Sequence, residues 1–518
     1  MQKHEIYLMM TKFTLCFFLF ARSTFGFTYP TPNHYLAPGE SIWPRPVDSH
    51  FTEEFITLSK NDMKLTSNEC PSVKHAFDGF IKNLPETEKI HFHPQIEIQL
   101  LFNDCPETPD SDMEEWYTIE VMKGTIVIEA SQSWGIIHGF TSLEQMVWRS
   151  TKKSDNNLVK NSINLNISKI MDTPRLKYRG VLLDTSRHYL PIPTIKRQLE
   201  LMRINKLNVF HWHIVDDPSF PYQSAILPKL TNPFKPEMIY TIKSVKQIIN
   251  FAALRGIRVI PEFDTPGHVK SWENVDENFL TQCGDASKGT FGSPIDVSNP
   301  NNYELVNQLY SEIRQVFRDE FVHLGGDEVS FNCWKSNENI TKFMAVNDLE
   351  TYEQLESFYI KKLLKIADSN KFKSIVWEEV FFNDEKLDKE VLVHVWKPRS
   401  WKETVKKVSA KGYHYILSGP WYLNYISYGE DYRNYYKVHI PKDNKLYGGE
   451  MCMWGEFVDE TNLESRLWPR GSAVAEKFWS ADTATTSFDD ETRARLDRMR
   501  CFMVGQGFNA EPLFPGYC

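Results

Sequence analysis

Residues 257–268 read IRVIPEFDTPGH, a short apolar run followed directly by polar residues that include Asp264 and His268. After residue 175 the same arrangement, an apolar run of strand length ending in polar or aromatic residues, occurs eight times. The segments are YRGVLLDTSRH (178–188), LNVFHWHIVDD (207–217), IRVIPEFDTPGH (257–268), EFVHLGGDE (320–328), SIVWEE (374–379), VLVHVWK (391–397), HYILSGPWYLN (414–424) and LYGGEMCMWGE (446–456). Continuous apolar strands that alternate with helices indicate a parallel sheet covered on both faces. Eight such units predict an α/β fold of the (β/α)8 TIM-barrel type.

Helices are predicted between several of these strands. Ser244 and Gln247 have the spacing of a capping box. Asn299 followed by Pro300 predicts an N-cap and the first residue of another helix. Residues 352–369 predict a third helix.

The N-terminus predicts a cleaved signal peptide over residues 1–26. Lys3 and Lys12 precede an apolar run that is too short to span a bilayer, and small residues follow it. A buried N-terminal strand is the alternative. No later stretch of the sequence is apolar enough for a membrane span. The net charge of −9 is spread along the chain and offers no basic tract for nucleic acid. These features indicate a lysosomal or secreted protein.

A smaller α/β domain is predicted over residues 27–172, with the barrel over 173–518. Residues 115–130 alternate polar and apolar side chains as strands do, and 133–149 have the pattern of an amphipathic helix. The pattern changes near residue 172, where we place the boundary.

Seven cysteines follow the predicted signal peptide, and an odd number in an oxidising compartment leaves one thiol free. Pairing neighbours along the chain suggests the disulfides Cys70–Cys105, Cys283–Cys333 and Cys501–Cys518. Cys452 is then left over in an apolar stretch, where a buried thiol is expected. Asn166 and Asn339 stand in Asn-x-Ser/Thr motifs and are glycosylation acceptors if the chain is secreted.

The residues at the eight strand ends should converge on one site, because a barrel brings the C-terminal ends of its strands together. They are Arg187, Asp216, Asp264, His268, Asp327, Glu328, Trp377, Glu378, Trp396, Trp421, Tyr422, Asn424, Trp454 and Glu456. Carboxylates and arginine bind sugar hydroxyls through charge-assisted hydrogen bonds, and tryptophan faces can cover a pyranose ring. The sequence contains no phosphate-binding glycine loop or dinucleotide fingerprint.

Several of these residues have other common roles. Asp264 would ordinarily cap a turn, Arg187 would form a structural salt bridge, and the tryptophans would fill a core. His211 and His213, with His268, could be the ligands of a metal-dependent barrel hydrolase, although a structural role for His211 and His213 is favoured. A sugar-binding protein without catalysis is a further alternative. The polar residues at all eight strand ends favour a catalytic site.

Asp327 and Glu328 are adjacent in HLGGDEVSFNCW (323–334). The two acids of most glycosidases face each other across the bond, about 5 Å or more apart. Adjacent residues of an extended chain point to opposite faces. The two glycines before them are expected to let a sugar approach the backbone.

At these motifs the sequence resembles the β-N-acetylhexosaminidases of glycoside hydrolase family 20, especially the lysosomal animal subunits. The matching stretches are RGVLLDTSRHYLP, NVFHWHIVDDPSFPYQS, RGIRVIPEFDTPGH, HLGGDEV, SIVWEEVF, PWYLNYISYG, MWGEFVD and RLWPRGSAVAEKFWS. The resemblance runs from about Ser41 to Cys518. It implies an α/β domain before a (β/α)8 barrel, the same three disulfides, and a free thiol at Cys452. It also implies a retaining exo-enzyme without metal or cofactor that releases terminal GlcNAc and GalNAc, with the substrate's 2-acetamido group as nucleophile.

The resemblance assigns roles by matching position. Glu328 matches the general acid, Asp327 the residue that holds the acetamido N–H and stabilises the oxazolinium, and Tyr422 the donor to the acetamido oxygen. The remaining matches are the sugar pocket (Trp377, Trp396, Trp454), the binders of the outer hydroxyls (Arg187, Glu456) and the residues that orient the acid (Asp216, His268, with Asp264 nearby).

Two further expectations come from the resemblance. Family members that prefer neutral substrates have Asp-Leu where this chain has Asn424-Tyr425, and those that accept sulfated or sialylated substrates have Asn-Arg. This chain is therefore expected to cleave neutral substrates and to act weakly on 6-sulfated ones. A homodimer is expected, with Tyr428 able to reach the partner's site.

Overall fold

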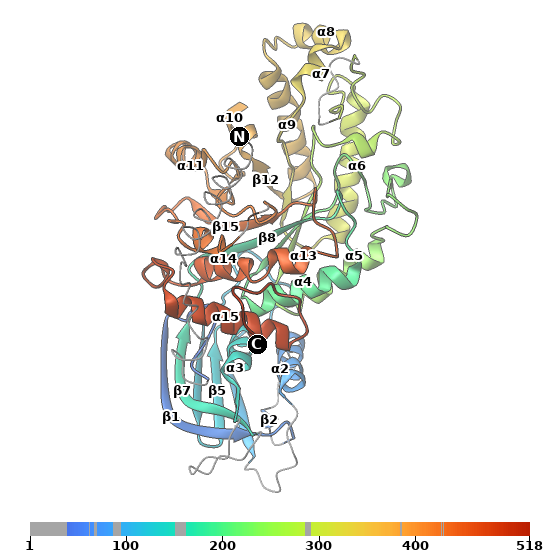
Figure 1. Cartoon of the computed structure of the whole chain (residues 1–518). Helices are drawn as coiled ribbons and strands as arrows, with labels where there is room; N and C mark the ends of the chain where they lie inside the picture. The colour runs from blue at the N-terminus through green and yellow to red at the C-terminus, as the bar shows by residue number, and fades with distance from the viewer. Residues whose placement is uncertain are drawn as a thin grey trace, which may run out of the picture.

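The computed structural model describes residues 39–61, 63–66, 70–85, 95–150, 162–284, 292–383, 386–425, 427 and 429–518. The predicted signal peptide and Tyr428 lie outside these residues. Figure 1 shows a barrel with surrounding helices above a separate sheet formed by the N-terminal part of the chain.

The barrel is closed by eight parallel strands, as the sequence predicted, in the order β10-β11-β12-β13-β14-β15-β8-β9. The strands are β8 (Tyr178–Asp184), β9 (Val209–His213), β10 (Arg258–Glu262), β11 (Phe321–His323), β12 (Lys373–Trp377), β13 (Leu392–Val395), β14 (Tyr415–Leu417) and β15 (Leu446–Met453). Each lies within one of the eight apolar segments, so the prediction of a TIM barrel is confirmed.

The helices of the barrel region follow its strands. They are α4 (Ile192–Ile204), α5 (Ile242–Ala253), α6 (Pro300–Val316), α7 (Phe331–Lys335), α8 (Glu338–Val346), α9 (Tyr352–Ser369), α10 (Glu378–Asn383), α11 (Trp401–Ala410), α12 (Tyr432–Tyr436), α13 (Leu463–Leu467), α14 (Arg470–Trp479) and α15 (Asp490–Gly505). Short 3₁₀ turns are η1 (Pro228–Leu230), η2 (Lys270–Trp272) and η4 (Asp482–Thr485).

Two of the predicted helix starts had different outcomes. Asn299 caps α6 as expected, because its side chain accepts a hydrogen bond from the backbone N–H of Asn301. The predicted capping box at Ser244 is wrong. The cap of α5 is Thr241, whose hydroxyl accepts from the N–H of Ser244, so Ser244 lies inside the first turn. The helix begins three residues earlier than predicted, because the hydroxyl of Thr241 caps the free N–H of the first turn.

The N-terminal sheet is mixed and has the order β1-β7-β4-β5-β3-β2, with β6 paired to β7. Its elements are β1 (Asp48–Leu58), β2 (Met63–Leu65), α2 (Pro71–Asn83), β3 (Ile96–Leu101), β4 (Tyr117–Met122), β5 (Thr125–Ala130), α3 (Ser133–Met146), β6 (Trp148–Arg149) and β7 (Ile163–Asp172). The predicted strands in 115–130 are the antiparallel pair β4 and β5. A predicted smaller α/β domain before the barrel is therefore present.

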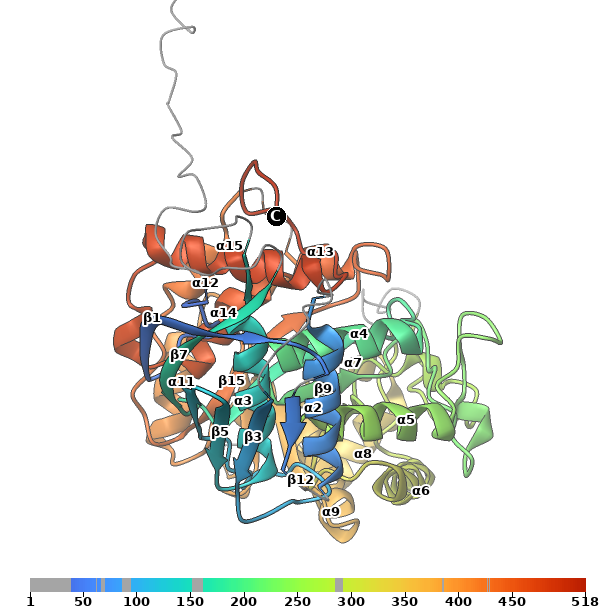
Figure 2. The same ribbon diagram turned by 90° about the horizontal axis from the view of Figure 1, so that it is seen from below.

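Helix α3 is more buried than an amphipathic surface helix. Every residue except Gln145 is buried, because the helix packs on its own sheet and also faces the barrel. Arg203 of α4 reaches across to it and donates to Glu144 at 3.0 Å and to Thr141 at 2.9 Å. Seen from below, the N-terminal strands and α2 and α3 overlie the barrel helices (Figure 2).

At the junction, each domain inserts one tryptophan into the core of the other. Trp43, before the first strand, belongs to the barrel core and donates to the carbonyl of Ser472 at 2.9 Å. Trp479 of α14 belongs to the core of the N-terminal sheet and donates to Asp172 at 2.9 Å. Asp172 also forms a fully buried ion pair with Lys206 at 2.9 Å. Removing either partner of that pair would leave a buried charge, so the junction favours one arrangement of the domains.

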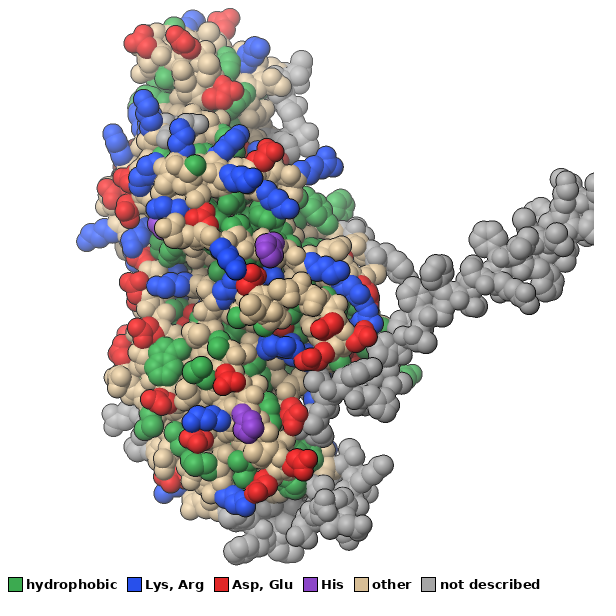
Figure 3. All heavy atoms as spheres, turned by 90° about the vertical axis from the view of Figure 1, so that its left-hand side faces the viewer, with side chains coloured by type: hydrophobic (Ala, Val, Ile, Leu, Met, Phe, Trp, Pro, Cys, Tyr) green, Lys and Arg blue, Asp and Glu red, His purple; other side chains and the backbone are tan. Residues whose placement is uncertain are grey.

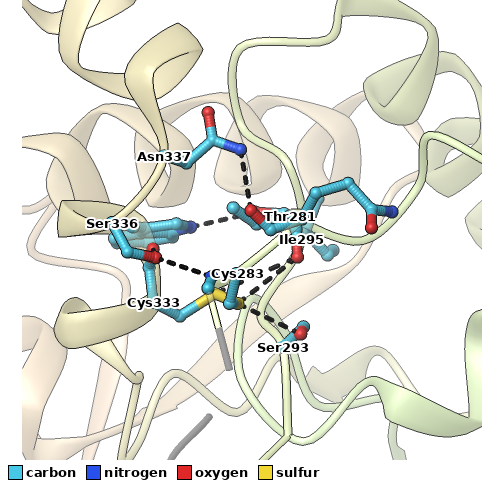
Figure 4. The surroundings of a disulfide bond; sticks show 10 residues. Thr281, Cys283, Ser293, Ile295, Cys333, Ser336 and Asn337 are labelled. Atoms are coloured by element: carbon cyan, nitrogen blue, oxygen red, sulfur yellow. Dashed lines mark hydrogen bonds between the residues drawn. A yellow bond between two sulfur atoms is a disulfide. The ribbon is translucent and has the colours of Figure 1, made fainter. Parts of the chain in front are cut away.

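The three suggested disulfides are present, Cys70–Cys105, Cys283–Cys333 and Cys501–Cys518, and Cys452 is a buried free thiol. Figure 4 shows the surroundings of Cys283–Cys333, where the indole of Trp334 donates to the carbonyl of Ile295 at 3.1 Å. This disulfide joins the segment that follows η2 to α7, directly after the two adjacent acids.

The two predicted glycosylation acceptors differ in their surroundings. Asn339 lies exposed in the first turn of α8. Asn166 is buried in β7, and its Oδ1 accepts a hydrogen bond from the indole of Trp148 at 2.7 Å. The fold therefore disfavours a glycan on Asn166, because the attachment amide is packed inside the sheet domain, and leaves Asn339 as the better candidate.

The surface carries both signs of charge. On the face shown in Figure 3, basic and acidic side chains are interspersed along the length of the molecule. None of the described helices is both long and apolar enough to cross a lipid bilayer.

Candidate active site

A pocket of about 430 Å³ opens where the barrel strands end. It is lined by Arg187, Asp327, Glu328, Trp377, Trp396, Tyr422, Asn424, Tyr425, Trp454, Glu456 and Phe457. These residues follow strands β8, β11, β12, β13, β14 and β15, so most of the predicted strand-end residues converge. Two do not. Trp421 donates to the carbonyl of Tyr435 and packs on Phe478, and Glu378 lies behind the wall, where it accepts from the N–H of Trp396.

The glycines before the two acids serve the protein's own packing. Gly325 and Gly326 have φ of 75° and 97°, which side chains rarely adopt. A Cβ on Gly325 would lie 1.6 Å from Oδ1 of Asp264, and the N–H of Gly326 donates to that same oxygen at 2.9 Å. The expectation that the glycines make room for a sugar is therefore replaced: Gly325 makes room for Asp264, and Gly326 makes room for Val380, whose Cγ2 would lie 2.4 Å from an added Cβ.

The two adjacent acids lie in different surroundings. The side chain of Asp327 is only 11% exposed, whereas that of Glu328 is 35% exposed at the pocket. Glu328 has φ of 52°, a left-handed conformation that is uncommon for a residue with a side chain. An extended chain would point these two neighbours to opposite faces. Because of this turn in the backbone, both carboxylates reach the same pocket.

The buried carboxylate, Asp327, has an unusual proton affinity. Burial, with a smaller contribution from the nearby Glu379, raises its pKa to about 7 against the opposing effect of His268. Among the described residues, Oδ1 of Asp327 has no hydrogen-bond partner. A buried acceptor without a partner costs free energy in the empty protein, and a ligand N–H would satisfy it.

A chain of charged side chains lies behind the acids. Nε2 of His268 lies 3.9 Å from Asp327 and 3.6 Å from Glu328, and its Nδ1 lies 3.3 Å from Asp216. Burial would lower the pKa of His268, but Asp216 and Asp327 outweigh it and raise that pKa well above its usual value. Arg187 approaches Asp216 at 2.9 Å. The predicted support residues are therefore adjacent to the acids rather than exposed in the pocket.

Asp264 is buried next to Asp327, and burial and the negative charge of Asp327 raise its pKa well above the usual range. Its predicted place near the acids agrees with this position, and its Oδ1 accepts from the N–H of Gly326 in the turn before the acids.

Aromatic rings form the pocket walls. The ring of Tyr422 stacks on Trp396 with centroids 6.0 Å apart, and Trp377 and Trp454 lie 6.0 Å apart at the inner end. The indole N–H of Trp396 donates to Glu379 at 2.9 Å. Sequence reasoning missed Glu379, although it follows Glu378 at the end of a strand segment. Its charge both fixes Trp396 and raises the pKa of Asp327.

The rim contains Phe457, which sequence reasoning did not place in the lining, and Tyr425, whose position the resemblance had singled out. Phe457 and Tyr425 are exposed large side chains, and Tyr425 stacks on Tyr422 at 5.8 Å. Arg187 lies over the ring of Trp454 at 5.2 Å, a cation–π contact. Phe457 directly follows Glu456, and its position was the only available signal.

His211 and His213 lie inside the barrel. Both ring nitrogens of His213 are occupied by carboxylates, Glu262 at 2.5 Å and Asp216 at 2.8 Å. His211 is held between Glu262 at 3.1 Å and Glu450 at 2.8 Å. This pairing favours the structural interpretation of the two histidines.

Comparisons with known proteins agree with this geometry. Residues 176–482 match the family described as "Glycosyl hydrolase family 20, catalytic domain", and residues 42–146 match "beta-acetyl hexosaminidase like". The chain is 40% identical over 517 residues to beta-hexosaminidase subunit beta of Felis catus, covering 94% of this chain and 95% of the relative. It is 43% identical over 436 residues to beta-hexosaminidase subunit alpha of Mus musculus, covering 81% and 80%. The structure of Flavobacterium johnsoniae chitobiase superposes with a TM-score of 0.79 at 26% identity, covering 91% and 74%.

Proposed function

This chain belongs to glycosyl hydrolase family 20, and we propose on that basis a division of labour among its pocket residues. The chain is a β-N-acetylhexosaminidase that removes terminal, non-reducing GlcNAc and GalNAc from glycoconjugates by substrate-assisted, retaining hydrolysis. The roles of individual residues are our proposal.

Glu328 is the general acid, because its carboxyl faces the pocket while His268 supports it from behind. In the first step Glu328 gives its proton to the glycosidic oxygen, the acetamido carbonyl oxygen attacks C1, and the C1–O bond breaks. The alcohol leaves and an oxazolinium forms. Water then attacks C1 and Glu328 takes its proton. The C1–O bond of the oxazolinium ring breaks, which restores the acetamido group and retains the configuration at C1. The attack is intramolecular, so effective molarity can contribute roughly 7 kcal/mol or more.

Asp327 holds the acetamido N–H and opposes the positive charge of the oxazolinium. The observation that carries this role is its buried Oδ1, which has no hydrogen-bond partner among the described residues. A substrate N–H would supply the missing donor, and the developing charge would stabilise the carboxylate of a residue whose pKa burial raises. This division explains why the acids are adjacent: the acetamide takes the place of the opposed carboxylate.

The Asp327→Asn variant tests this assignment. We expect kcat on aryl β-GlcNAc substrates to fall by about 10²–10³-fold, since an amide cannot oppose the oxazolinium charge. Added azide should not restore turnover, because no covalent glycosyl-enzyme exists to be intercepted. The matched control is Asp217→Asn, which changes a neighbouring acid that accepts from the N–H of Lys270 outside the pocket lining. A kcat for Asp327→Asn close to that of the control would contradict the role.

The other pocket residues bind the sugar. Tyr422 donates to the acetamido oxygen, and Trp377, Trp396 and Trp454 enclose the acetamide and the ring. Arg187 and Glu456 bind the outer hydroxyls, with Asp216 and His268 orienting the acid. These assignments are supported by the shared pocket and by the contacts described above.

Asn424 and Tyr425 set the preference for neutral substrates. Asn424 provides no carboxylate that would repel a 6-sulfate, but Tyr425 provides no guanidinium to bind it. We expect kcat/KM for 6-sulfo-GlcNAc arylglycosides to lie well below that for the unsulfated compound. Measuring both substrates with one enzyme preparation checks this, and equal values would refute it.

We propose a homodimer that is lysosomal or secreted. The three disulfides support an oxidising compartment, and a signal peptide over residues 1–26 would deliver the chain there. Tyr428 would reach the partner's site. Sedimentation of the active enzyme at monomer mass would refute the dimer.

A further inference from the structure

A buried carboxylate beneath the pocket contacts both halves of the proposed machinery. Glu262, the last residue of β10, is fully buried inside the barrel. Its Oε1 accepts a hydrogen bond from the indole N–H of Trp377 at 2.8 Å and lies 3.1 Å from Nδ1 of His323. Its Oε2 lies 2.5 Å from Nδ1 of His213 and 3.1 Å from Nε2 of His211.

The contacts of Oε1 and Oε2 lead to the pocket by two routes. Trp377 is part of the inner wall and lines the pocket directly. His213 passes the contact on to Asp216 at 2.8 Å, and Asp216 lies 3.3 Å from His268, which faces both Asp327 and Glu328. One carboxylate therefore joins the wall around the acetamide to the support of the acids.

A carboxylate at this position costs free energy unless its hydrogen-bond partners compensate for the lost hydration. TIM-barrel interiors are ordinarily filled by branched apolar side chains, and an ion buried in such a core loses several kcal/mol of hydration. Here burial opposes the charge, but the surrounding histidines outweigh it and hold the pKa of Glu262 well below its usual range. The carboxylate stays ionised and can accept from the N–H groups of Trp377 and His213 together.

A second buried carboxylate in the barrel provides a comparison. Glu450 of β15 is also fully buried and interacts with His211 at 2.8 Å and with the hydroxyl of Tyr178 at 2.5 Å. Neither His211 nor Tyr178 lines the pocket. The two glutamates therefore share burial and a histidine, but only Glu262 is bonded to a pocket wall.

We propose that Glu262 is a positioning residue for the hydrolysis, which holds Trp377 against the acetamide and the chain His213–Asp216–His268 behind the acids. The inference rests on the roles proposed for Asp327 and Glu328. A single residue would thereby fix the position of the acid relative to the acetamide pocket.

The test is Glu262→Gln, which keeps the shape of the side chain but leaves one oxygen in place of two. One of the N–H groups, on Trp377 or on His213, then loses its acceptor. We expect kcat/KM to fall by about 10²-fold, the size of effect that a small misplacement of reacting groups produces. Two readouts distinguish positioning from stability: kcat should fall more for aryl glycosides with poor leaving groups, and inhibition by free GlcNAc should weaken.

The matched control is Glu450→Gln, which makes the same chemical change in the same barrel interior. We expect its kcat and its inhibition by GlcNAc to change no more than a few-fold, even where its melting temperature drops. A folded Glu262→Gln enzyme with near-normal kcat/KM would overturn the proposal. Equal losses in the two variants would also overturn it, because they would assign the effect to the core as a whole.

Trp377→Phe keeps the test decisive where Glu262→Gln does not fold. The change removes the indole N–H that binds Glu262 and retains an aromatic wall. We expect inhibition by GlcNAc to weaken about tenfold or more, the effect of losing a hydrogen bond to a charged group, and unchanged inhibition would refute the positioning role. Normal turnover by Glu328→Gln would instead refute the proposed acid, whereas normal turnover by Glu262→Gln beside an inactive Glu328→Gln would refute only the positioning role.

Discussion

The pocket at the barrel mouth and a groove between the two domains are almost equal in volume, about 430 and 440 Å³. Their charges are arranged in opposite ways. In the groove, Glu200 binds Arg203 at 2.7 Å and Arg255 at 2.6 Å, and Arg203 also binds Glu144 at 3.0 Å. In the pocket, Asp327 is buried with one oxygen that lacks a hydrogen-bond partner among the described residues. Volume therefore does not distinguish the two cavities, whereas incomplete hydrogen bonding does.

The pKa values of Glu200 and Asp327 differ in the same sense, although burial raises the pKa of Glu144, the other paired acid in the groove. Burial would raise the pKa of Glu200, but Arg203 and Arg255 outweigh it and lower that pKa to about 2. Burial raises the pKa of Asp327 to about 7 because the opposing charge of His268 does not compensate. The charges of Glu144, Glu200, Arg203 and Arg255 are paired within the protein. Oδ1 of Asp327 would gain a hydrogen-bond partner from a ligand.

The largest expected effect is on the pocket side of the comparison. Glu328→Gln should lower kcat by about 10²–10⁴-fold, because it removes the proton donor for the leaving alcohol. The loss should be largest for poor leaving groups and should leave the fold unchanged, which kinetics and circular dichroism would check.

Glu200→Gln is the corresponding change in the groove and serves as its control. Near-wild-type kcat in that variant beside a strong loss in Glu328→Gln would sharpen the contrast. Comparable losses of kcat in both would show that the groove also serves the reaction.

The next largest effect is a loss of unfolding free energy when a charge in the groove is removed. Removing one partner of a fully buried ion pair costs about 3–5 kcal/mol. Glu200 keeps 24% of its side-chain exposure, so we expect Glu200→Gln to lose about 2 kcal/mol of unfolding free energy at pH 7. Because the folded-state pKa is lowered, this contribution exists above the unfolded value and is lost as pH falls toward 2. Denaturant unfolding at pH 7 and at pH 3 should show the deficit shrinking, and a deficit that grew at low pH would be inconsistent with the pairing.

The last expected effect should have the opposite sign. Because the pKa of Asp327 is raised to about 7 from 3.8, the folded protein holds a proton that the unfolded chain releases between these values. Stability therefore falls as pH rises through this window. Asp327→Asn cannot ionise and should be more stable than wild type at pH 8, by an amount that shrinks toward zero near pH 4. Thermal unfolding across pH would check this, and a variant less stable than wild type at pH 8 would contradict it.

Much of the fold follows from local patterns in the sequence. Eight apolar runs predicted the eight barrel strands, and helix α9 occupies the predicted residues 352–369. Local rules were less successful where two residues competed for one position, as at Thr241 and Ser244. They also missed the burial of α3 on both sides, since the second face is covered by a domain that lies later in the chain.

The sequence by itself determined which residues end the strands, and therefore most of the acids and tryptophans and the arginine that meet at the barrel mouth; Trp421 and Glu378 end strands but lie outside the pocket. Strand periodicity and the closure of a parallel barrel are sufficient for that result. Only the tertiary structure decided which of two adjacent acids is buried, why Gly325 must lack a side chain, and that Glu262 contacts Trp377. Each of these depends on atoms from strands far apart in the chain, such as Asp264 against Gly325. Proton affinity and packing depend on that surrounding shell of atoms, which no local sequence pattern contains.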